Sequence, residues 1–176
     1  MYGNQIAIDK PIRVNEDSIQ IIKSFNCGNE VINEYLKNKA KDDAQAVTFI
    51  LIDKKEKAVI GYYSLNCSGF IINSMSHFTI YPAVEIKMFA MDEKYHHLPY
   101  SDDPEDGTFS DYIFSFVISK IYDFTEKYCG ADKIILYSVP KAKNFYKKNG
   151  FLEFEDFMLK SESRFLDGCI PMYMDL

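Results

Sequence analysis

Long apolar segments are missing from this sequence of 176 residues. A helix that crosses a bilayer needs about 18 or more consecutive apolar residues, and no run of that length occurs. The first residues, Met1-Tyr2-Gly3-Asn4, also lack the basic and apolar regions of a secretory signal peptide. Both absences argue against a membrane or exported protein, and we therefore expect a soluble, cytoplasmic protein with no membrane partner.

Cysteine is scarce and scattered. The chain has four, which lie far apart and form no C-x-x-C pair: Cys27, Cys67, Cys129 and Cys169. This spacing argues against a disulfide framework or a zinc site and favours four reduced, mostly buried thiols. The only other grouping of metal-ligand types is His96 and His97 ahead of Asp102 and Asp103. Adjacent histidines without a fixed spacing favour a solvated loop, so we expect no metal.

Positive charge does not predominate either. The chain carries 20 Lys and Arg against 26 Asp and Glu, a net charge of -6. Because nucleic-acid binding depends on neutralising phosphates, this balance argues against a general nucleic-acid-binding protein. Two local basic stretches remain, a loop with Lys54, Lys55 and Lys57 and a helix with Lys141, Lys143, Lys147 and Lys148. Each either contacts an anionic partner or forms a solvated surface.

What the chain does contain is a large apolar fraction, 47% of its residues, including 14 Phe and 13 Tyr. That is enough for a substantial core, and no linker or internal repeat divides the sequence, so we expect one domain over residues 1–176. Apolar patterning predicts strands over 6–14, 47–52, 59–65, 69–72, 132–139, 151–154 and 170–176. It predicts helices after Asn15, after the turn at 26–29 and after Pro140, and a long central helix that Gly130 ends in the left-handed conformation.

The most informative stretch runs from Tyr81 to Ile121. Val84 to Met91 is typical of a strand buried on both faces, and its only charges, Glu85 and Lys87, are costly there unless paired or used. A long polar loop follows, and from Thr108 apolar residues recur with helical spacing. A strand, a loop and a helix N-terminus in this order often hold a phosphate group, because backbone amides and the helix dipole face the anion.

Three phrases of the sequence resemble the GNAT family of N-acetyltransferases. Glu85 to Met91, followed by a loop and a helix, is similar to the fourth strand and pyrophosphate loop of that family. Ala142 to Phe151 is similar to its Ala-x-x-Phe-Tyr-x-x-x-Gly-Phe ending, and Phe25 to Leu36 resembles the first two helices of its toxin-type subgroup. The resemblance implies an α/β (α+β) fold: a GNAT-like mixed, mostly antiparallel sheet, flanked by helices, whose central parallel strand pair splays to form the cofactor cleft.

The resemblance also implies an activity, acetyl-CoA-dependent transfer of an acetyl group to a primary amine. In the family a tyrosine beside the cofactor sulfur protonates the departing thiolate, and Tyr146 occupies the matching position. A phenol with a pKa of ~10 suits this role because it stays protonated at cellular pH. Glu85 lies where histone acetyltransferases of the family place a general base. The residues alone leave two alternatives open: Tyr146 packed on the sheet with a solvated hydroxyl, and Glu85 paired with Lys87 or another lysine.

Acetyl-CoA is the implied cosubstrate. The main chain of Phe89, Ala90 and Met91 is implied to hold its pantetheine arm, and the diphosphate and neighbouring groups are implied to lie at Gly107, Thr108, Phe109, Ser110 and Asn144. This loop departs from the family pattern Arg/Gln-x-x-Gly-x-Gly/Ala, since Glu105 replaces the basic or amide residue and an acidic segment, 96–104, precedes it. A second hypothesis therefore stays open, a GNAT-fold binding module that no longer holds coenzyme A.

The acceptor amine is not fixed by these phrases. The toxin-type resemblance implies aminoacyl-tRNA, while a small-molecule or peptide amine fits the same chemistry. The same subgroup implies two protein partners, a second copy in a homodimer and an antitoxin.

Overall fold

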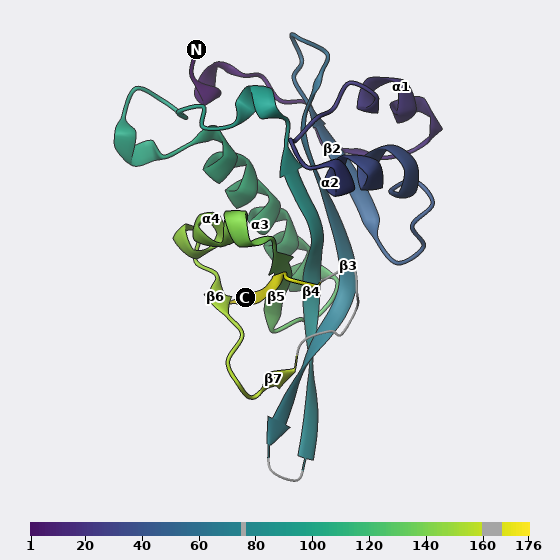
Figure 1. The fold of residues 1–176 in the computed structure, drawn as a ribbon, viewed down its shortest axis with the longest axis vertical. Coiled ribbons are helices and arrows are strands. Elements are labelled where there is room, and N and C mark those ends of the chain that lie inside the picture. The colour runs from purple at the N-terminus through teal and green to yellow at the C-terminus, as the bar shows by residue number, and fades with distance from the viewer. Residues whose placement is uncertain (75–76, 160–166) are drawn as a thin grey trace. The chain divides into compact units, whose positions relative to one another are not determined.

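The computed structural model describes residues 1–74, 77–159 and 167–176. Its strands and α-helices, labelled in Figure 1 where there is room, are β1 (Ile12–Arg13), α1 (Ile19–Ile22), α2 (Glu30–Glu34), β2 (Val47–Ile52), β3 (Val59–Ser74), β4 (His77–Met91), α3 (Phe109–Lys127), β5 (Lys133–Ser138), α4 (Lys143–Lys148), β6 (Leu152–Glu153), β7 (Met158–Leu159) and β8 (Ile170–Asp175). Short 3-10 segments cover Gly3–Gln5, Glu16–Ser18, Glu93–Tyr95, Pro104–Asp106 and Pro140–Ala142, and a π-helix covers Tyr35–Lys39. None of the described helices is long and apolar enough to span a bilayer.

Within the described residues, eight strands follow the order β1-β2-β3-β4-β5-β8-β6, with β7 on β3. The β4–β5 pair is parallel, whereas the β1–β2, β2–β3, β3–β7, β5–β8 and β6–β8 pairs are antiparallel. The parallel pair follows from α3, since a helical crossover between neighbouring strands returns the chain in the same direction. The predicted mixed, mostly antiparallel sheet with one central parallel pair is confirmed.

The chain forms two compact units, one of residues 1–65 and 88–117 and the other of residues 66–87 and 118–176. In the first unit, α1, α2 and the π-helix supply apolar side chains to a core shared with β2, β3 and the end of β4. Tyr62 lies fully buried within it, with its ring 5.5 Å from that of Phe25 and its hydroxyl donating to the Ile32 carbonyl at 2.8 Å. The hydroxyl is thus satisfied without water, as a buried phenol requires.

A polar network fixes the turn between α1 and α2. Gly28 adopts a positive φ of 77°, and Asn29 caps α2 by accepting from the Val31 and Ile32 amides. The Asn26 amide donates to the Asp92 carboxylate at 2.9 Å, and the buried Asn33 side chain donates to Asn26 Oδ1 at 2.8 Å. The polar residues at 26–33 therefore have a structural role, because they attach this turn to Asp92, the residue after β4.

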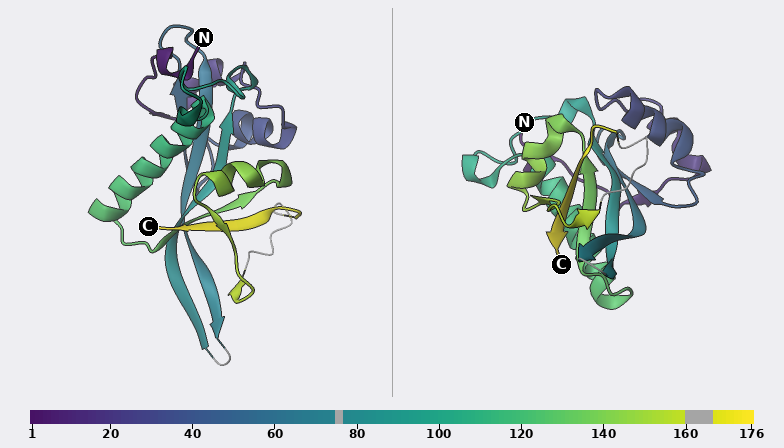
Figure 2. Two further views of the ribbon diagram at one scale, coloured as in Figure 1. Left: turned by 90° about the vertical axis from the view of Figure 1, so that its left-hand side faces the viewer. Right: turned by 60° about the horizontal axis from the view of Figure 1, so that its bottom comes forward.

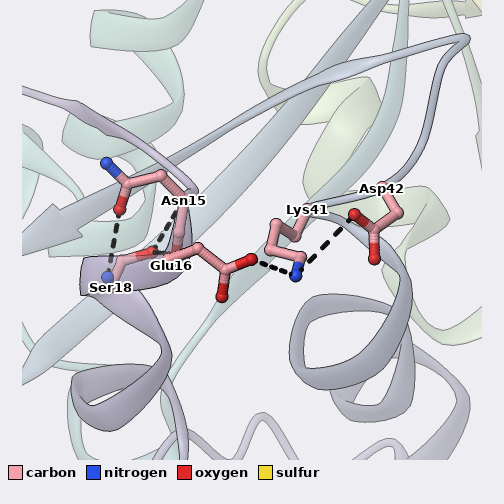
Figure 3. A network of polar contacts seen from close by, with 5 residues as sticks. All are labelled: Asn15, Glu16, Ser18, Lys41 and Asp42. Atoms are coloured by element: carbon pink, nitrogen blue, oxygen red, sulfur yellow. Dashed lines mark hydrogen bonds and ion pairs between the residues drawn. The ribbon is translucent and has the colours of Figure 1, made fainter.

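A second polar network in this unit caps the start of the 3-10 segment Glu16–Ser18. Asn15 and Ser18 form a reciprocal capping box, in which the Asn15 carboxamide accepts the Ser18 amide and the Ser18 hydroxyl accepts the Asn15 amide. Figure 3 shows Lys41 extending to Glu16 at 2.6 Å and to Asp42 at 3.8 Å. Because Glu16 and Asp42 are well exposed, these ion pairs add little stability.

The second unit contains the C-terminal part of β3, the N-terminal part of β4, and the chain from Ile118 in α3 onward. Its core joins Phe70 of β3, Ala83 of β4, Ile135 of β5, Met158 of β7 and Tyr173 of β8. The strands β3 and β4 lie side by side in both views of Figure 2. The last strand, β8, pairs with β5 along its whole length.

Several sequence predictions need correction. The strands expected over 59–65 and 69–72 are one strand, because the polar residues between them do not interrupt β3. The edge strand expected over 6–14 is reduced to Ile12–Arg13 and one bridge at Ile8, since Pro11 lacks the amide that a longer ladder needs. Gly130 has no positive φ, and α3 ends earlier, at Lys127. The four cysteines are free thiols, but one is exposed and three are half-buried, so the expectation of buried thiols was wrong.

Two predicted segments lie partly outside the described residues. The polar connection at 73–76 is described only for Asn73 and Ser74, which end β3. The polar loop between 154 and 170 includes the short strand β7, and its residues 160–166 lie outside the described part of the chain.

Candidate active site

Tyr146 occupies the third position from the end of α4, and the sequence around it explains why. Gly150 takes the left-handed conformation with φ of 89°, its amide donates to the Lys147 carbonyl, and the Phe151 amide donates to the Tyr146 carbonyl at 3.0 Å. This is a Schellman motif, which typically adds an apolar contact between the residue after the glycine and the third-last helical residue. Here that contact joins the rings of Tyr146 and Phe151, 6.1 Å apart.

Tyr146 is buried at the end of this motif, and burial affects the pKa of its hydroxyl. Its side chain is 8% exposed, and Phe145 packs edge-on at 5.3 Å. Burial raises the pKa of the Tyr146 hydroxyl well above its usual value, because a phenolate would lose its hydration. The hydroxyl therefore carries its proton at any physiological pH and is a permanent hydrogen-bond donor.

Glu85 lies on β4, in the stretch that pairs with β5. It faces Ile135 in the parallel register, and the ladder ends one residue later at Ile86 and Leu136. The side chain is half-buried, and within residues 1–74, 77–159 and 167–176 no hydrogen bond or ion pair engages its carboxylate. The alternative prediction of an ion pair between Glu85 and Lys87 is therefore not met in the described part of the chain. A half-buried carboxylate in this state is available to a ligand.

The end of β4 carries Phe89, Ala90 and Met91, which lie in the first unit and beyond the last β4–β5 pair. Phe89 packs edge-on against Phe114 of α3, with ring centres 4.9 Å apart. Opposite them, Gly61 of β3 approaches so closely that an added Cβ would lie 2.6 Å from the Ala90 carbonyl oxygen. These packing constraints fix the backbone of the predicted pantetheine-binding stretch.

The opening turn of α3 satisfies its own polar groups. The Asp111 carboxylate accepts from the Thr108 amide at 2.8 Å and from its hydroxyl at 2.7 Å, while Thr108 Oγ1 accepts from the Asp111 amide at 3.2 Å. The Phe109 amide donates to the Leu98 carbonyl at 2.8 Å. The amides of Thr108, Phe109 and Asp111 are thus used within the chain, and a carboxylate lies where the helix dipole favours an anion.

The acidic segment 96–107 folds back against this helix end. An antiparallel bridge joins Pro99 to Thr108, and the Tyr100 amide donates to the carbonyl of Gly107, which has φ of 72°. The Ser101 hydroxyl donates to Asp106, and the Asp103 side chain accepts the Glu105 amide. Polar side chains of the 96–107 loop, which the sequence suggested would only be solvated, therefore make hydrogen bonds that stabilise the loop's conformation. Among the described residues, no group of three or more His, Cys, Asp or Glu could hold a metal ion.

The basic residues of α4 are partly neutralised. Lys143 and Lys147 both pair with Glu153, at 2.9 and 2.6 Å. These two cations lower the pKa of the Glu153 carboxyl. Asn144, predicted to contact the cofactor, is exposed on the same helix.

Sequence reasoning missed two residues that matter here. Asp111 completes a Thr-x-x-Asp pattern, a variant of the capping box that could have been recognised from its spacing. Asn66 of β3 carries a buried side-chain oxygen, Oδ1, without a hydrogen-bond partner in the described structure. No sequence signal marks Asn66, because its environment depends on the pairing of distant strands.

The sequence matches no family model. It also has no significant match among curated proteins.

Solved structures do resemble this one. A bacterial toxin matches with 18% identity over 97% of this chain and 91% of its own, with a TM-score of 0.71. A Tyr-to-Phe mutant of the toxin AtaT, bound to acetyl-CoA and the C-terminus of the antitoxin AtaR, matches with 14% identity over 97% and 92% of the chains and a TM-score of 0.64. AtaT complexed with acetyl-methionyl-tRNAfMet matches with 18% identity over 94% of each chain and a TM-score of 0.65. The protein therefore has the GNAT fold, in the form that these toxins share.

Proposed function

We propose that the protein is an N-acetyltransferase, which moves an acetyl group from acetyl-CoA to a primary amine. The observation that carries the proposal is Tyr146, a buried and permanently protonated phenol held by a Schellman motif on the helix that follows the parallel strand pair. The fold and the acetyl-CoA bound by the structurally similar AtaT support it.

In the proposed reaction the amine nitrogen attacks the thioester carbonyl carbon, and the C–S bond then breaks to release a thiolate. Tyr146 donates a hydrogen bond to this departing sulfur. A thiol has a pKa of ~8.5, below that of the buried phenol, so Tyr146 stabilises the thiolate mainly as a donor, while the proton that finally neutralises the products comes from the amine.

Glu85 is the proposed general base. An amine must lose a proton to attack, and a half-buried carboxylate with no ion pair in the described structure can accept it directly or through water. This assignment matters most for acceptors of high pKa. A lysine near ~10.4 leaves very little neutral amine at pH 7, whereas an α-amino group near ~8 leaves an appreciable fraction.

The cofactor contacts are proposed as two groups. The main chain of Phe89, Ala90 and Met91 holds the pantetheine arm and polarises the thioester carbonyl, supported by the end of the β4–β5 ladder at Ile86. The loop residues Gly107, Thr108, Phe109 and Ser110, with Asn144, lie at the diphosphate. Since Thr108 and Phe109 already make hydrogen bonds within the chain, we expect weaker diphosphate binding than a glycine-rich loop would give.

For the acceptor we propose aminoacyl-tRNA. The complex of AtaT with acetyl-methionyl-tRNAfMet supports this, and the similar AtaT–AtaR complex supports an antitoxin partner. The net charge of -6 means that tRNA would rely on local cations such as the exposed Lys141.

A transfer assay tests the proposal. The full chain is incubated with acetyl-CoA and either methionyl-tRNA or glycinamide, and the acetylated product and released thiol are measured by mass spectrometry and a thiol reagent. We expect product with the wild type and little with Tyr146→Phe. The absence of any product from the wild type at millimolar acetyl-CoA would contradict the proposal.

One observation favours a second candidate, a GNAT-fold binding module without catalysis. The Asp111 carboxylate and the hydrogen-bonded amides of the first α3 turn lie where we propose the diphosphate would bind. The double substitution Glu105→Gln, Asp106→Gly separates the two: an enzyme should change its affinity for acetyl-CoA, while a module should bind none before or after the change.

A further inference from the structure

Residues 98–106, here called the lid, lie between two residues with positive φ. These are His97, with φ of 56°, and Gly107, with φ of 72°. Positive φ is uncommon outside glycine, so the chain turns sharply at both ends of the lid. A loop that opens as a unit changes its backbone angles mainly at a few terminal residues. His97 and Gly107 occupy those two positions.

The lid uses amides that the proposed diphosphate site needs. The Leu98 carbonyl accepts the Phe109 amide at 2.8 Å, and the Pro104 carbonyl accepts the Gly107 amide at 3.4 Å. A helix N-terminus binds an anion through backbone amides that have no other acceptor. Because both acceptors belong to the lid, its opening would free the two amides together.

The lid also carries charge that repels a diphosphate. Residues 96–111 contain five carboxylates and neither lysine nor arginine; the carboxylates are those of Asp102, Asp103, Glu105, Asp106 and Asp111. The first four belong to exposed residues of the lid. Like charges at short range oppose binding, and salt screens this effect. A closed lid therefore opposes acetyl-CoA both through its carbonyls and through its carboxylates.

The start of the chain fastens the lid. Gly3 and Asn4, here called the strap, donate their amides to the carbonyls of Pro99 and Tyr100, both at 2.8 Å. Figure 1 shows this segment in purple beside the teal loop. Gly3 also packs so closely on Phe109 that an added Cβ would lie 2.6 Å from Phe109 Cδ2. The strap therefore contacts the lid and the end of α3 at the same time.

The strap is itself attached to the sheet of the first unit. An antiparallel bridge joins Ile8 to Asp53, next to the end of β2, and the Asp9 amide donates to the Ile52 carbonyl at 3.0 Å. All of these residues, the lid and the start of α3 belong to that unit. The strap therefore ties the lid to a strand whose neighbours are buried.

We propose that the strap and the lid form an autoinhibitory device, in which the lid must leave the first turn of α3 before the diphosphate of acetyl-CoA binds. This inference rests on the proposed acetyl transfer, to which it adds control of the cosubstrate site. Closed and open lids form a two-state equilibrium, and the apparent affinity for acetyl-CoA is that of the open form reduced by the fraction that is open. Weakening the strap raises this fraction and so raises the affinity.

A lid that only capped the helix would behave in the opposite way. Loosening it would disorder the start of α3 and weaken acetyl-CoA binding, because more of the site would have to become ordered on binding. The sign of the change in affinity therefore separates an autoinhibitory lid from a structural one.

Amide hydrogen exchange on the full chain detects the opening of the lid. The Asn4 amide donates to the Tyr100 carbonyl, and the Tyr100 amide donates to the Gly107 carbonyl at 3.0 Å. Since release of the lid breaks both bonds, we expect saturating acetyl-CoA to speed exchange at both amides. A ligand that binds without opening the lid would leave exchange unchanged or slow it. Either of those results would overturn the proposal.

Gly3→Ala weakens the strap. The added methyl group meets the buried Phe109 side chain, so the strap must shift away from the lid. We expect acetyl-CoA to bind roughly 3- to 10-fold more tightly in calorimetry, the effect of losing about one hydrogen bond from the closed form. Gly130→Ala adds the same group where no atom lies within 4 Å, and it should bind like the wild type. Equal or weaker binding by Gly3→Ala would overturn the proposal.

A second variant loosens the lid from the other side, in case Gly3→Ala disturbs Phe109 or fails to fold. The Tyr100 ring stacks on that of Tyr112 in α3, with centres 4.6 Å apart, and the Tyr112 side chain is exposed. Tyr112→Ala removes this contact, and we expect tighter acetyl-CoA binding with faster exchange at Tyr100. Tyr128→Ala, which removes an exposed tyrosine just beyond α3, is the matched control. Faster lid exchange in Tyr112→Ala without tighter binding would overturn the proposal.

The failure of this inference can be told from the failure of the proposed function. If the wild type acetylates an amine and both variants bind acetyl-CoA as it does, the autoinhibition is wrong and the transferase stands. If the wild type binds no acetyl-CoA at millimolar concentration but Gly3→Ala or Tyr112→Ala does, the autoinhibition stands and the wild-type chain alone is no transferase. If none of the three binds acetyl-CoA, both proposals are wrong.

Discussion

Polar groups at the first turn of α3 and on the strands β3 and β4 differ in how far the chain satisfies their hydrogen bonds. At the helix turn, Thr108 and Asp111 exchange three hydrogen bonds, and Leu98 accepts the next amide. At the strand pair, Asn66 Oδ1 has no donor, and the Glu85 carboxylate joins no ion pair among the described residues. The turn that resembles a ligand site in sequence satisfies most of its own hydrogen bonds, while Asn66 Oδ1 and the Glu85 carboxylate on the strands have no partner in the described structure.

The difference teaches where to look for function in this fold. A satisfied network stabilises the chain and must be broken before a ligand can enter, whereas an unsatisfied one lowers stability until a ligand arrives. By this criterion Glu85, the proposed base for the acceptor amine, can bind a ligand without breaking hydrogen bonds within the chain, whereas the proposed diphosphate site cannot. The following predictions test this contrast, from the largest expected effect to the smallest.

Replacing Tyr146 with phenylalanine should cause the largest loss. The Schellman motif and the ring contact with Phe151 remain, so the fold should be unchanged, while the donor to the thiolate is lost. We expect acetyl transfer to fall about 10²- to 10⁴-fold, measured as kcat. Tyr122→Phe removes an exposed hydroxyl that donates to the Asp175 carbonyl and is the matched control. A Tyr146→Phe enzyme within threefold of the wild type would remove Tyr146 from the mechanism.

Glu85→Gln should slow transfer about 10²-fold at pH 7, since the amide cannot accept the proton of the amine. The remaining rate should rise with pH until the amine loses its own proton, near ~8 for an α-amino group. The check is a pH profile of kcat/KM for glycinamide. Glu126→Gln provides the control, because Glu126 is exposed on α3. Parallel profiles for Glu85→Gln and the wild type would show that Glu85 is no base.

Gly150→Ala tests the motif that positions Tyr146. An alanine at φ of 89° is strained, although its Cβ would meet only Met174 Sδ, at 3.6 Å. We expect a loss of about 1–2 kcal/mol in the free energy of unfolding, measured by urea denaturation. Gly130→Ala is the control, because it has no positive φ and no atoms within 4 Å of the added Cβ. Equal stabilities of the two variants would contradict the Schellman assignment.

Asp111→Asn tests the self-satisfied helix end. Removing the carboxylate weakens the capping box and should lower the free energy of unfolding by about 0.5–1 kcal/mol, seen as a decrease in Tm. The same change removes a negative charge from the proposed diphosphate site, so acetyl-CoA should bind more tightly, as calorimetry would show. Asp102→Asn, exposed in the preceding loop, should change neither. Lower stability with weaker acetyl-CoA binding would mean that Asp111 supports the cofactor site.

Asn66→Leu should have the smallest effect on stability. Because Asn66 Oδ1 has no partner in the described structure, its loss should leave the free energy of unfolding unchanged or raise it by up to about 1 kcal/mol. Asn33→Leu is the contrast, because the Asn33 amide contacts Asn26 and Cys27, and it should cost about 1–3 kcal/mol. If Asn66→Leu destabilises as much as Asn33→Leu, Asn66 is a structural residue.

Local patterns predicted much of the fold. The strand at 47–52, the helix near Thr108 and the helix that ends before Gly150 depend on neighbours in sequence, and the structure confirms them. The parallel β4–β5 pair followed from the crossover helix. The continuity of β3 was missed because its polar middle, residues 66–68, belongs to a long strand paired with β4, which local sequence does not reveal.

The candidate site was less predictable. The Tyr146, Gly150 and Phe151 spacing encodes a local motif, so its structure could be expected from sequence. The occupied amides at Thr108 and Phe109 depend on the fold of the 96–107 segment, and the buried, unsatisfied oxygen of Asn66 depends on the pairing of distant strands. Long-range pairing of this kind leaves no pattern in a single sequence.

The most direct test of the central claim is calorimetric titration of the full chain with acetyl-CoA. Binding that saturates at or below millimolar concentration, and that persists in Tyr146→Phe because the phenol acts on the departing sulfur, is the result expected of a transferase. A wild-type chain that shows no heat of binding at millimolar acetyl-CoA would contradict the account and leave a GNAT fold without its cosubstrate.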